Sequence, residues 1–278
     1  IVARSRGVAD KMSAGIQYLL KKNKVTVING FGKINGKKEV VVTGTDGKAT
    51  TYGANHIILA TGGRARELPN LPIDGKKVIG YREAMTLPTQ PKSMIVVGSG
   101  AIGVEFAYYY NSVGTDVTIV EFMPKIVPVE DEDVSRELAK QYKKKGMTIM
   151  TNSSVEAVDT KGAGCKVSVK TAKGMETIEC DVVLSAVGIQ TNLENIGLES
   201  LGIKTEKGKV VVDDFYQTNV PGVYAIGDIV DGPALAHVAS AEGIICVEKI
   251  SGQNVEPLDY GNIPGCTYCS PEIASVGY

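Results

Sequence analysis

The clearest pattern of apolar and polar positions lies near the middle of the chain. Met94–Val97 is a short continuous apolar run, as is typical of a parallel strand buried on both faces. Ala101–Val113 predicts a helix that ends at Gly114. A second apolar run, Val117–Val120, predicts the next strand. Together these segments predict a βαβ unit.

The remaining pattern predicts two small β-meanders and three more helices. Apolar residues at helical spacing predict a helix at 3–22, and early acids with late lysines predict another at Asp131–Lys145. A third is expected at Leu235–Ile250. Strands are predicted at Val25–Ile28, Glu39–Thr43, Thr50–Tyr52, 55–60, Met147–Thr151, Val155–Val158, Cys165–Thr171, Met175–Glu179, Asp181–Val187 and Val223–Ile226. This mixture predicts an α/β protein.

Length and proline content suggest the domain limits. The 278 residues leave room for about two domains. Prolines make 64–92 the most linker-like segment, so we expect a boundary near residue 90. Further boundaries are expected near residues 215 and 252. The expected segments are 1–90, 91–215, 216–252 and 253–278.

Three glycines follow the central predicted strand in the spacing G-x-G-x-x-G. Gly98 permits a tight turn, Gly100 lets a pyrophosphate approach the backbone, and Gly103 lets the helix pack close to the sheet. The helix N-terminus then offers free N–H groups to the phosphates. Glu121 lies eighteen positions beyond Gly103, where its carboxylate can accept hydrogen bonds from the ribose hydroxyls and would repel a 2′-phosphate. The pattern therefore predicts a site for NAD rather than NADP.

Composition narrows the class of function. The chain is 43% hydrophobic and 22% charged, and its net charge of −1 gives no reason to expect nucleic acid or a membrane surface as a partner. No apolar run approaches the ~18 residues that span a bilayer. Five cysteines, mostly isolated, favour a reducing, cytoplasmic compartment. Cys266 and Cys269 form a C-x-x-C without a second pair or paired histidine, so we interpret them as ordinary thiols and expect no metal.

Two further predicted strands end in glycine. ATGG at 60–63 and AIGD at 225–228 each provide a place where a ligand can lie against the backbone. Asp228 follows Gly227, and its carboxylate is placed to hold a polyol hydroxyl. A lone aspartate at such a turn would instead be interpreted as a helix N-cap.

These stretches occur together with several others. NGFGKI, IILATGG, VVGSGAIGVEFA, VVLSAVG and TNVPGVYAIGDIVDGPALAHVASAEGIICVEKISG are spread over nearly the whole chain. In this combination the sequence resembles the FAD-dependent pyridine nucleotide–disulfide oxidoreductases, and among them the dihydrolipoamide dehydrogenases most closely. The resemblance implies a Rossmann-type NAD-binding domain, a parallel sheet with a β-meander, at 91–215. That domain would be inserted in a partial FAD-binding domain, 1–90 and 216–252, and followed by the start of an α+β dimerisation domain, 253–278.

The resemblance also implies which residues contact each cofactor. For FAD these are Gly32, Thr61, Gly62, Gly63, Asp228, Ala234, Leu235, Ala236 and His237, the histidine through its backbone. For NAD they are Gly98, Ser99, Gly100, Ala101, Ile102, Gly103, Val104, Glu105, Glu121, Val155 and Gly188. Ile102 would act as a gate over the flavin, and Glu105 would help to place the nicotinamide. From the residues alone, Glu105 is a simple helix acid.

The activity implied is oxidation of a dithiol through an enzyme disulfide and FAD to NAD. The dithiol would be dihydrolipoamide on the lipoyl domain of an acyltransferase in a 2-oxoacid dehydrogenase complex, and the parent protein would be a cytoplasmic homodimer. Alternatives are another member of the family, of the transhydrogenase or mercuric reductase type, a non-catalytic NAD-binding fragment, or a protein with a structural role inside a multienzyme complex.

Two departures from the family concern catalysis. No second glycine fingerprint precedes Gly98, and no cysteine precedes Cys165, so the redox pair C-x-x-x-x-C of the family has no counterpart here. The family's C-terminal His and Glu pair is also missing. We therefore expect a fragment that lacks both ends, contains no catalytic residue of its own, and has no lipoamide activity alone.

Overall fold

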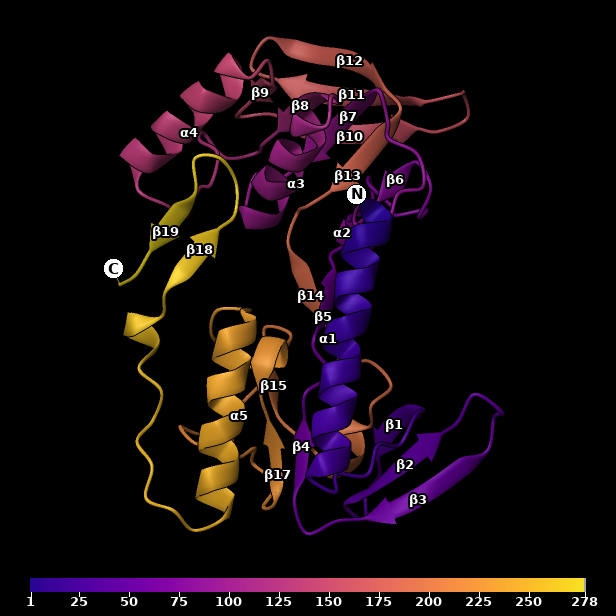
Figure 1. The fold of residues 1–278 in the computed structure, drawn as a ribbon, viewed down its shortest axis with the longest axis vertical. Helices are drawn as coiled ribbons and strands as arrows, with labels where there is room; N and C mark the ends of the chain where they lie inside the picture. The colour runs from indigo at the N-terminus through magenta and orange to yellow at the C-terminus, as the bar shows by residue number, and fades with distance from the viewer. Residues whose placement is uncertain (278) are drawn as a thin grey trace. The chain divides into compact units, whose positions relative to one another are not determined.

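The computed structural model describes residues 1–277 and divides them into two compact units (Figure 1). The first unit comprises residues 3–64 and 190–263, and the second comprises 65–189 together with the segment from residue 264 onward. The chain passes between the units at β5 (Gly63–Ala65), at β14 (Ile189–Thr191) and again between Ile263 and Pro264. These two units are defined by the contacts that residues make within each of them. The limits expected at residues 90, 215 and 252 instead separate the segments by the cofactor that each would bind, and they remain predictions.

The second unit is built on a five-stranded parallel sheet. Its strands lie in the order β6 (Val78–Ile79), β13 (Val182–Ser185), β7 (Ser93–Val97), β8 (Asp116–Val120) and β9 (Thr148–Met150). The chain runs outward from β7 to β9 and then returns to β13 on the other side of β7. The strand order therefore reverses beside β7, which is where open α/β sheets bind ligands.

Both faces of this sheet are covered. Met94 and Val96 of β7 pack in one apolar cluster with the helices, and Ile95 and Val97 pack in another with a meander. The helices are α3 (Ala101–Ser112) and α4 (Glu132–Lys144), and the meander is β10 (Ser154–Asp159), β11 (Cys165–Thr171) and β12 (Gly174–Cys180). Successive residues of β7 point to opposite faces of the sheet, and both faces are buried, so every position from Met94 to Val97 is apolar. A short helix, α2 (Tyr81–Ala84), and a hairpin, β18 (Gly265–Thr267) and β19 (Ile273–Ser275), complete this unit.

The first unit is assembled from smaller sheets. Strands β1 (Phe31–Ile34), β2 (Glu39–Thr43) and β3 (Ala49–Gly53) form an antiparallel meander, and β4 (Ile57–Leu59) pairs in parallel with β17 (Val223–Ala225). Short strands β15 (Thr205–Glu206) and β16 (Lys209–Val210), helix α5 (Ala236–Ile250) and the 3-10 turns η1 (Leu198–Leu201), η2 (Gly227–Ile229) and η3 (Tyr260–Asn262) complete it. Helix α1 (Val2–Lys22) forms as predicted and buries none of its residues.

The structure confirms the βαβ unit and the α/β class but corrects two expectations. Val25–Ile28 is not a strand. Both edges of β2 are occupied by other segments, with Phe31 of β1 opposite Thr43 on one side and Tyr52 of β3 opposite Val40 on the other. The segment 64–92 is not a linker, since it contains β5, β6 and α2. Its prolines separate short elements of the second unit.

Helix α4 is held to the sheet mainly by its apolar face. Leu138 is only 1% exposed in the helix-side cluster of the second unit. We expect Leu138→Ala to lower the free energy of unfolding by about 2–5 kcal/mol, because it removes packed methyl groups and leaves a cavity. Val129, which is 91% exposed, provides the control, and Val129→Ala should change the value by less than about 0.5 kcal/mol. Urea unfolding of the chain checks both, and equal losses would contradict the packing.

Candidate functional site

The turn between β7 and α3 is shaped by two glycines that the chain's own packing requires. Gly98 has φ +93°, and a Cβ atom there would lie 2.5 Å from the carbonyl oxygen of Ala186. A Cβ on Gly103 would lie 2.1 Å from the carbonyl oxygen of Gly98. Neither position accommodates a side chain without a backbone shift. The helix therefore starts directly against the end of the strand.

Gly100 is different, because nothing in the protein excludes a side chain there. Its φ is −66°, and a Cβ at this position would meet no atom within 4 Å. Gly100 is the N-cap of α3, and no side chain caps this helix end. The result is open space in front of free backbone N–H groups at a helix N-terminus, the arrangement that receives phosphate groups.

Glu121 lies behind this turn at the end of β8. Its side chain is 6% exposed, and Oε2 accepts hydrogen bonds from the backbone N–H and the hydroxyl of Ser99, at 2.8 Å and 2.5 Å. Its Oε1 accepts from the backbone N–H of Met123 at 2.7 Å. The carboxylate thus fixes the glycine turn itself, and its two oxygens retain further acceptor capacity for a ligand.

The other residues expected to contact NAD lie at different depths in the second unit. Val104 and Val155 are buried, Ile102 and Glu105 are partly buried, and Ala101 is exposed. Gly188, with φ +110°, faces open space. Oε1 of Glu105 accepts a hydrogen bond from the backbone N–H of Tyr268 at 2.7 Å, which ties α3 to the β18–β19 hairpin. Sequence spacing gave no sign of this contact, because the two residues are 163 positions apart.

In the first unit the two glycine-ended strands lie side by side. Strands β4 and β17 are parallel neighbours, so the turn at Thr61–Gly63 and the turn at Gly227–Asp228 leave the same end of the pair. Gly227 has φ +75°. Asp228 is partly buried, and among residues 1–277 its carboxylate makes no hydrogen bond or ion pair. An unpaired, half-buried carboxylate at a strand end fits a ligand hydroxyl as its partner.

The turn after β4 is held by a residue that the sequence did not single out. The hydroxyl of Thr61 donates to the carbonyl of Asn192 at 2.7 Å, and the Asn192 side-chain amide donates to the carbonyl of Thr61 at 3.0 Å. The Asn192 N–H also donates to the carbonyl of Gly62. Arg64 binds Glu194 through two hydrogen bonds, and this guanidinium lowers the pKa of Glu194 to about 2.

The remaining residues expected to contact FAD are accessible. Gly32 is exposed within β1, Gly63 begins β5, and Ala234, Ala236 and His237 are exposed at the start of α5. Leu235 is the N-cap of α5, and no side chain caps this helix end either.

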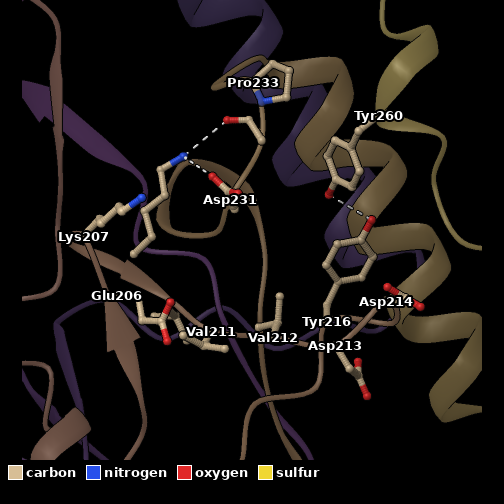
Figure 2. A pocket seen from close by; sticks show the side chains of 13 residues that line it. Glu206, Lys207, Val211, Val212, Asp213, Asp214, Tyr216, Asp231, Pro233 and Tyr260 are labelled. Atoms are coloured by element: carbon tan, nitrogen blue, oxygen red, sulfur yellow. Dashed lines mark hydrogen bonds and ion pairs between the residues drawn. The ribbon is translucent and has the colours of Figure 1, made fainter.

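A separate cavity of about 590 Å³ lies in the first unit (Figure 2). Its wall includes Tyr216 and Tyr260, whose hydroxyl oxygens are 3.2 Å apart. None of the residues expected to bind a cofactor lines it. Within residues 1–277, no group of three or more His, Cys, Asp or Glu side chains is arranged to hold a metal, and no helix is both long and apolar enough to cross a membrane.

Several known proteins match the whole chain. It is 48% identical to a dihydrolipoyl dehydrogenase of Rhizobium etli and 46% identical to one of Zymomonas mobilis, over 100% of this chain and 61% and 60% of those proteins. A leghemoglobin reductase of Glycine max is 40% identical over 96% of the chain and 51% of that protein. The chain thus spans about three fifths of the first two relatives.

The crystal structure of LpdA from Mycobacterium tuberculosis has the same fold. It superimposes with a TM-score of 0.92 at 31% identity, covering 100% of this chain and 61% of that one. A family model described as pyridine nucleotide-disulphide oxidoreductase matches residues 2–243. Since this match covers most of its length, the chain belongs to the pyridine nucleotide-disulphide oxidoreductase family.

Proposed function

We propose that this chain is the nucleotide-binding part of an NAD- and FAD-dependent dihydrolipoyl dehydrogenase. The observation that carries the proposal is the turn at Gly98–Gly103, where a helix N-terminus faces open space at Gly100. Its similarity to proteins named dihydrolipoyl dehydrogenase supports the choice of reaction. Under this proposal 91–215 binds NAD, 1–90 and 216–252 bind FAD, and 253–278 begins a dimerisation domain.

The second unit would hold NAD. The backbone around Gly100 would receive the pyrophosphate, and Glu121 would accept hydrogen bonds from the adenosine ribose while it keeps Ser99 in place. Ile102 and Glu105 on α3 would lie near the nicotinamide, with Glu105 steadied by the backbone of Tyr268.

The first unit would hold FAD. Asp228 would accept a hydroxyl of the ribityl chain, because its carboxylate is partly buried and has no partner among the described residues. The uncapped start of α5 would direct its N–H groups to the flavin. When bound, FAD would supply the hydride chemistry that links a dithiol to NAD.

Four of the five cysteines of this chain are buried thiols that do not suit the dithiol step. Burial raises the pKa of the Cys165, Cys180, Cys246 and Cys269 thiols, to about 12 for Cys180 and about 11 for Cys246. A thiol with a raised pKa is a poor nucleophile at neutral pH. Under this proposal the redox pair and the acid/base residue would come from outside these 278 residues, and the chain alone would not turn over dihydrolipoamide.

The partners follow from the proposed reaction. Dihydrolipoamide on the lipoyl domain of an acyltransferase in a 2-oxoacid dehydrogenase complex would be the substrate, and the protein would act as a homodimer. All five cysteines are free, which supports a reducing compartment such as the cytoplasm.

One set of measurements can test both the proposed reaction and the proposed contact between Asp228 and FAD. The protein that carries this chain should contain FAD and reduce NAD with dihydrolipoamide. We expect Asp228→Ala to weaken FAD binding by about tenfold or more, because a charge-assisted hydrogen bond is lost. The control is Asp231→Ala, a fully exposed aspartate three positions away, which should bind FAD normally. A colourless wild-type protein that lacks this activity would refute the proposal.

Substitutions at Gly100 and Gly103 should distinguish an effect on NAD binding from an effect on folding. We expect Gly100→Ala to change the thermal midpoint of the chain only slightly, because a Cβ fits there and φ is ordinary, although an N-cap prefers glycine to alanine. The same change should weaken NAD binding by about tenfold or more by obstructing the pyrophosphate. Gly103→Ala should lower the thermal midpoint, because its Cβ would collide with the carbonyl of Gly98. Calorimetric NAD titration and thermal melting check both. NAD affinity unchanged in Gly100→Ala would place the nucleotide elsewhere.

Glu121 should set the preference between the two nucleotides. Glutamine has one acceptor oxygen where glutamate has two, so Glu121→Gln would leave either the donors of Ser99 or the backbone N–H of Met123 without an acceptor. We expect NAD binding about tenfold weaker and a smaller gap between NAD and NADP, measured by titration with each. Glu176→Gln, on the exposed strand β12, is the control and should change neither affinity.

A further inference from the structure

Glu242 is a buried carboxylate that the proposed contacts with FAD and NAD do not use. It lies on α5 and is 1% exposed, and with Glu121 it is one of two buried acidic side chains among residues 1–277. Burying a carboxylate is unfavourable unless hydrogen bonds replace its water. An apolar side chain, such as its buried neighbours Val238 and Cys246 on the same helix, would fill the space without that cost.

The hydrogen bonds of Glu242 show what the carboxylate does. Its Oε2 accepts the backbone N–H of Gly227 at 2.5 Å, and its Oε1 accepts the hydroxyl of Tyr260 at 2.7 Å. Since the proton of Tyr260 points to Glu242, the hydroxyl of Tyr216 donates to Tyr260 across 3.2 Å (Figure 2). Burial raises the pKa of both tyrosines, so they remain protonated donors.

The backbone N–H that donates to Glu242 lies immediately before Asp228. Gly227 adopts φ +75° to turn the chain out of β17, and its N–H is the backbone donor next to the proposed flavin carboxylate. The ring of Tyr260 also packs where a Cβ on Gly232 would lie, 2.7 Å from its Cε1 atom. Glu242 and Tyr260 thus contact the segment 227–232 on both sides of Asp228.

We propose that Glu242, completed by Tyr260, is the positioning group that orients Asp228 toward the flavin ribityl chain. The inference rests on the proposed function, because it takes Asp228 as the contact with FAD. Glu242 does not itself touch the flavin in this account. It accepts a backbone N–H that no apolar replacement would satisfy, and the adjacent carboxylate is thereby held in one direction.

The test uses Glu242→Ala, Glu242→Gln and Tyr260→Phe in the protein that carries this chain. Deflavinated protein is titrated with FAD, and the absorption and fluorescence of the bound flavin are recorded. We expect Glu242→Ala to bind FAD about tenfold or more weakly, since a buried donor loses its acceptor. Glu242→Gln should restore most of the affinity, because its oxygen accepts from Gly227 and its amide donates to Tyr260. Tyr260→Phe should give an intermediate loss and a shifted flavin spectrum.

A matched control distinguishes positioning from general stability. Tyr110 is a buried tyrosine of the second unit whose hydroxyl donates to the carbonyl of Ala84 at 2.6 Å. Tyr110→Phe should lower the unfolding midpoint about as much as Tyr260→Phe but leave flavin affinity and spectrum unchanged.

The outcomes are distinguishable. If the wild-type protein binds FAD and all three variants keep its affinity and spectrum, the inference is wrong and the proposed function stands. It is also wrong if flavin affinity falls equally in Tyr110→Phe and Tyr260→Phe, because the loss then follows stability alone. If the wild-type protein binds no FAD, the proposed function itself fails.

Discussion

The closeness of two backbone segments at the end of β7 is the constraint on which the second unit depends. Helix α3 begins so near the strand that a Cβ on Gly103 would lie 2.1 Å from the carbonyl oxygen of Gly98. This contact directs the N-terminus of the helix to the point where the strand order reverses. The sheet can carry the glycine turn rigidly because it is covered on both faces, by α3 and α4 on one and by the meander on the other.

The two units share one design despite different sheets. In each, a strand ends in a glycine turn, and a buried carboxylate from elsewhere in the unit accepts a backbone N–H of that turn. Glu121 does so for Ser99 in the second unit, and Glu242 does so for Gly227 in the first. A carboxylate is a strong acceptor in a poorly solvated setting, so it can hold a loop that has few side chains of its own.

Much of the second unit could be predicted because its signals are local. Three patterns lie within thirty residues of one another: the apolar run of β7, the glycine spacing and the apolar run of β8. Each predicts a local structure for a known physical reason. The strand predicted at Val25–Ile28 failed because pairing depends on the register of β2, and local apolar character does not specify register. Asn192 and Tyr268 were missed because their contacts join segments 131 and 163 positions apart. Tyr260 is only 18 positions from Glu242, but no spacing rule connects a tyrosine in a loop to a carboxylate on a helix.

The open space at Gly100 has a consequence for engineering. Most glycines at tight turns resist replacement, and a stability screen retains them automatically. Gly100 gains no such protection, since an alanine there meets no obstacle. The smaller unfolded-state entropy of alanine and the preference of an N-cap for glycine act in opposite directions, so the folded chain would tolerate the change. A screen that measures folding alone would therefore accept a variant whose nucleotide site is filled by a methyl group.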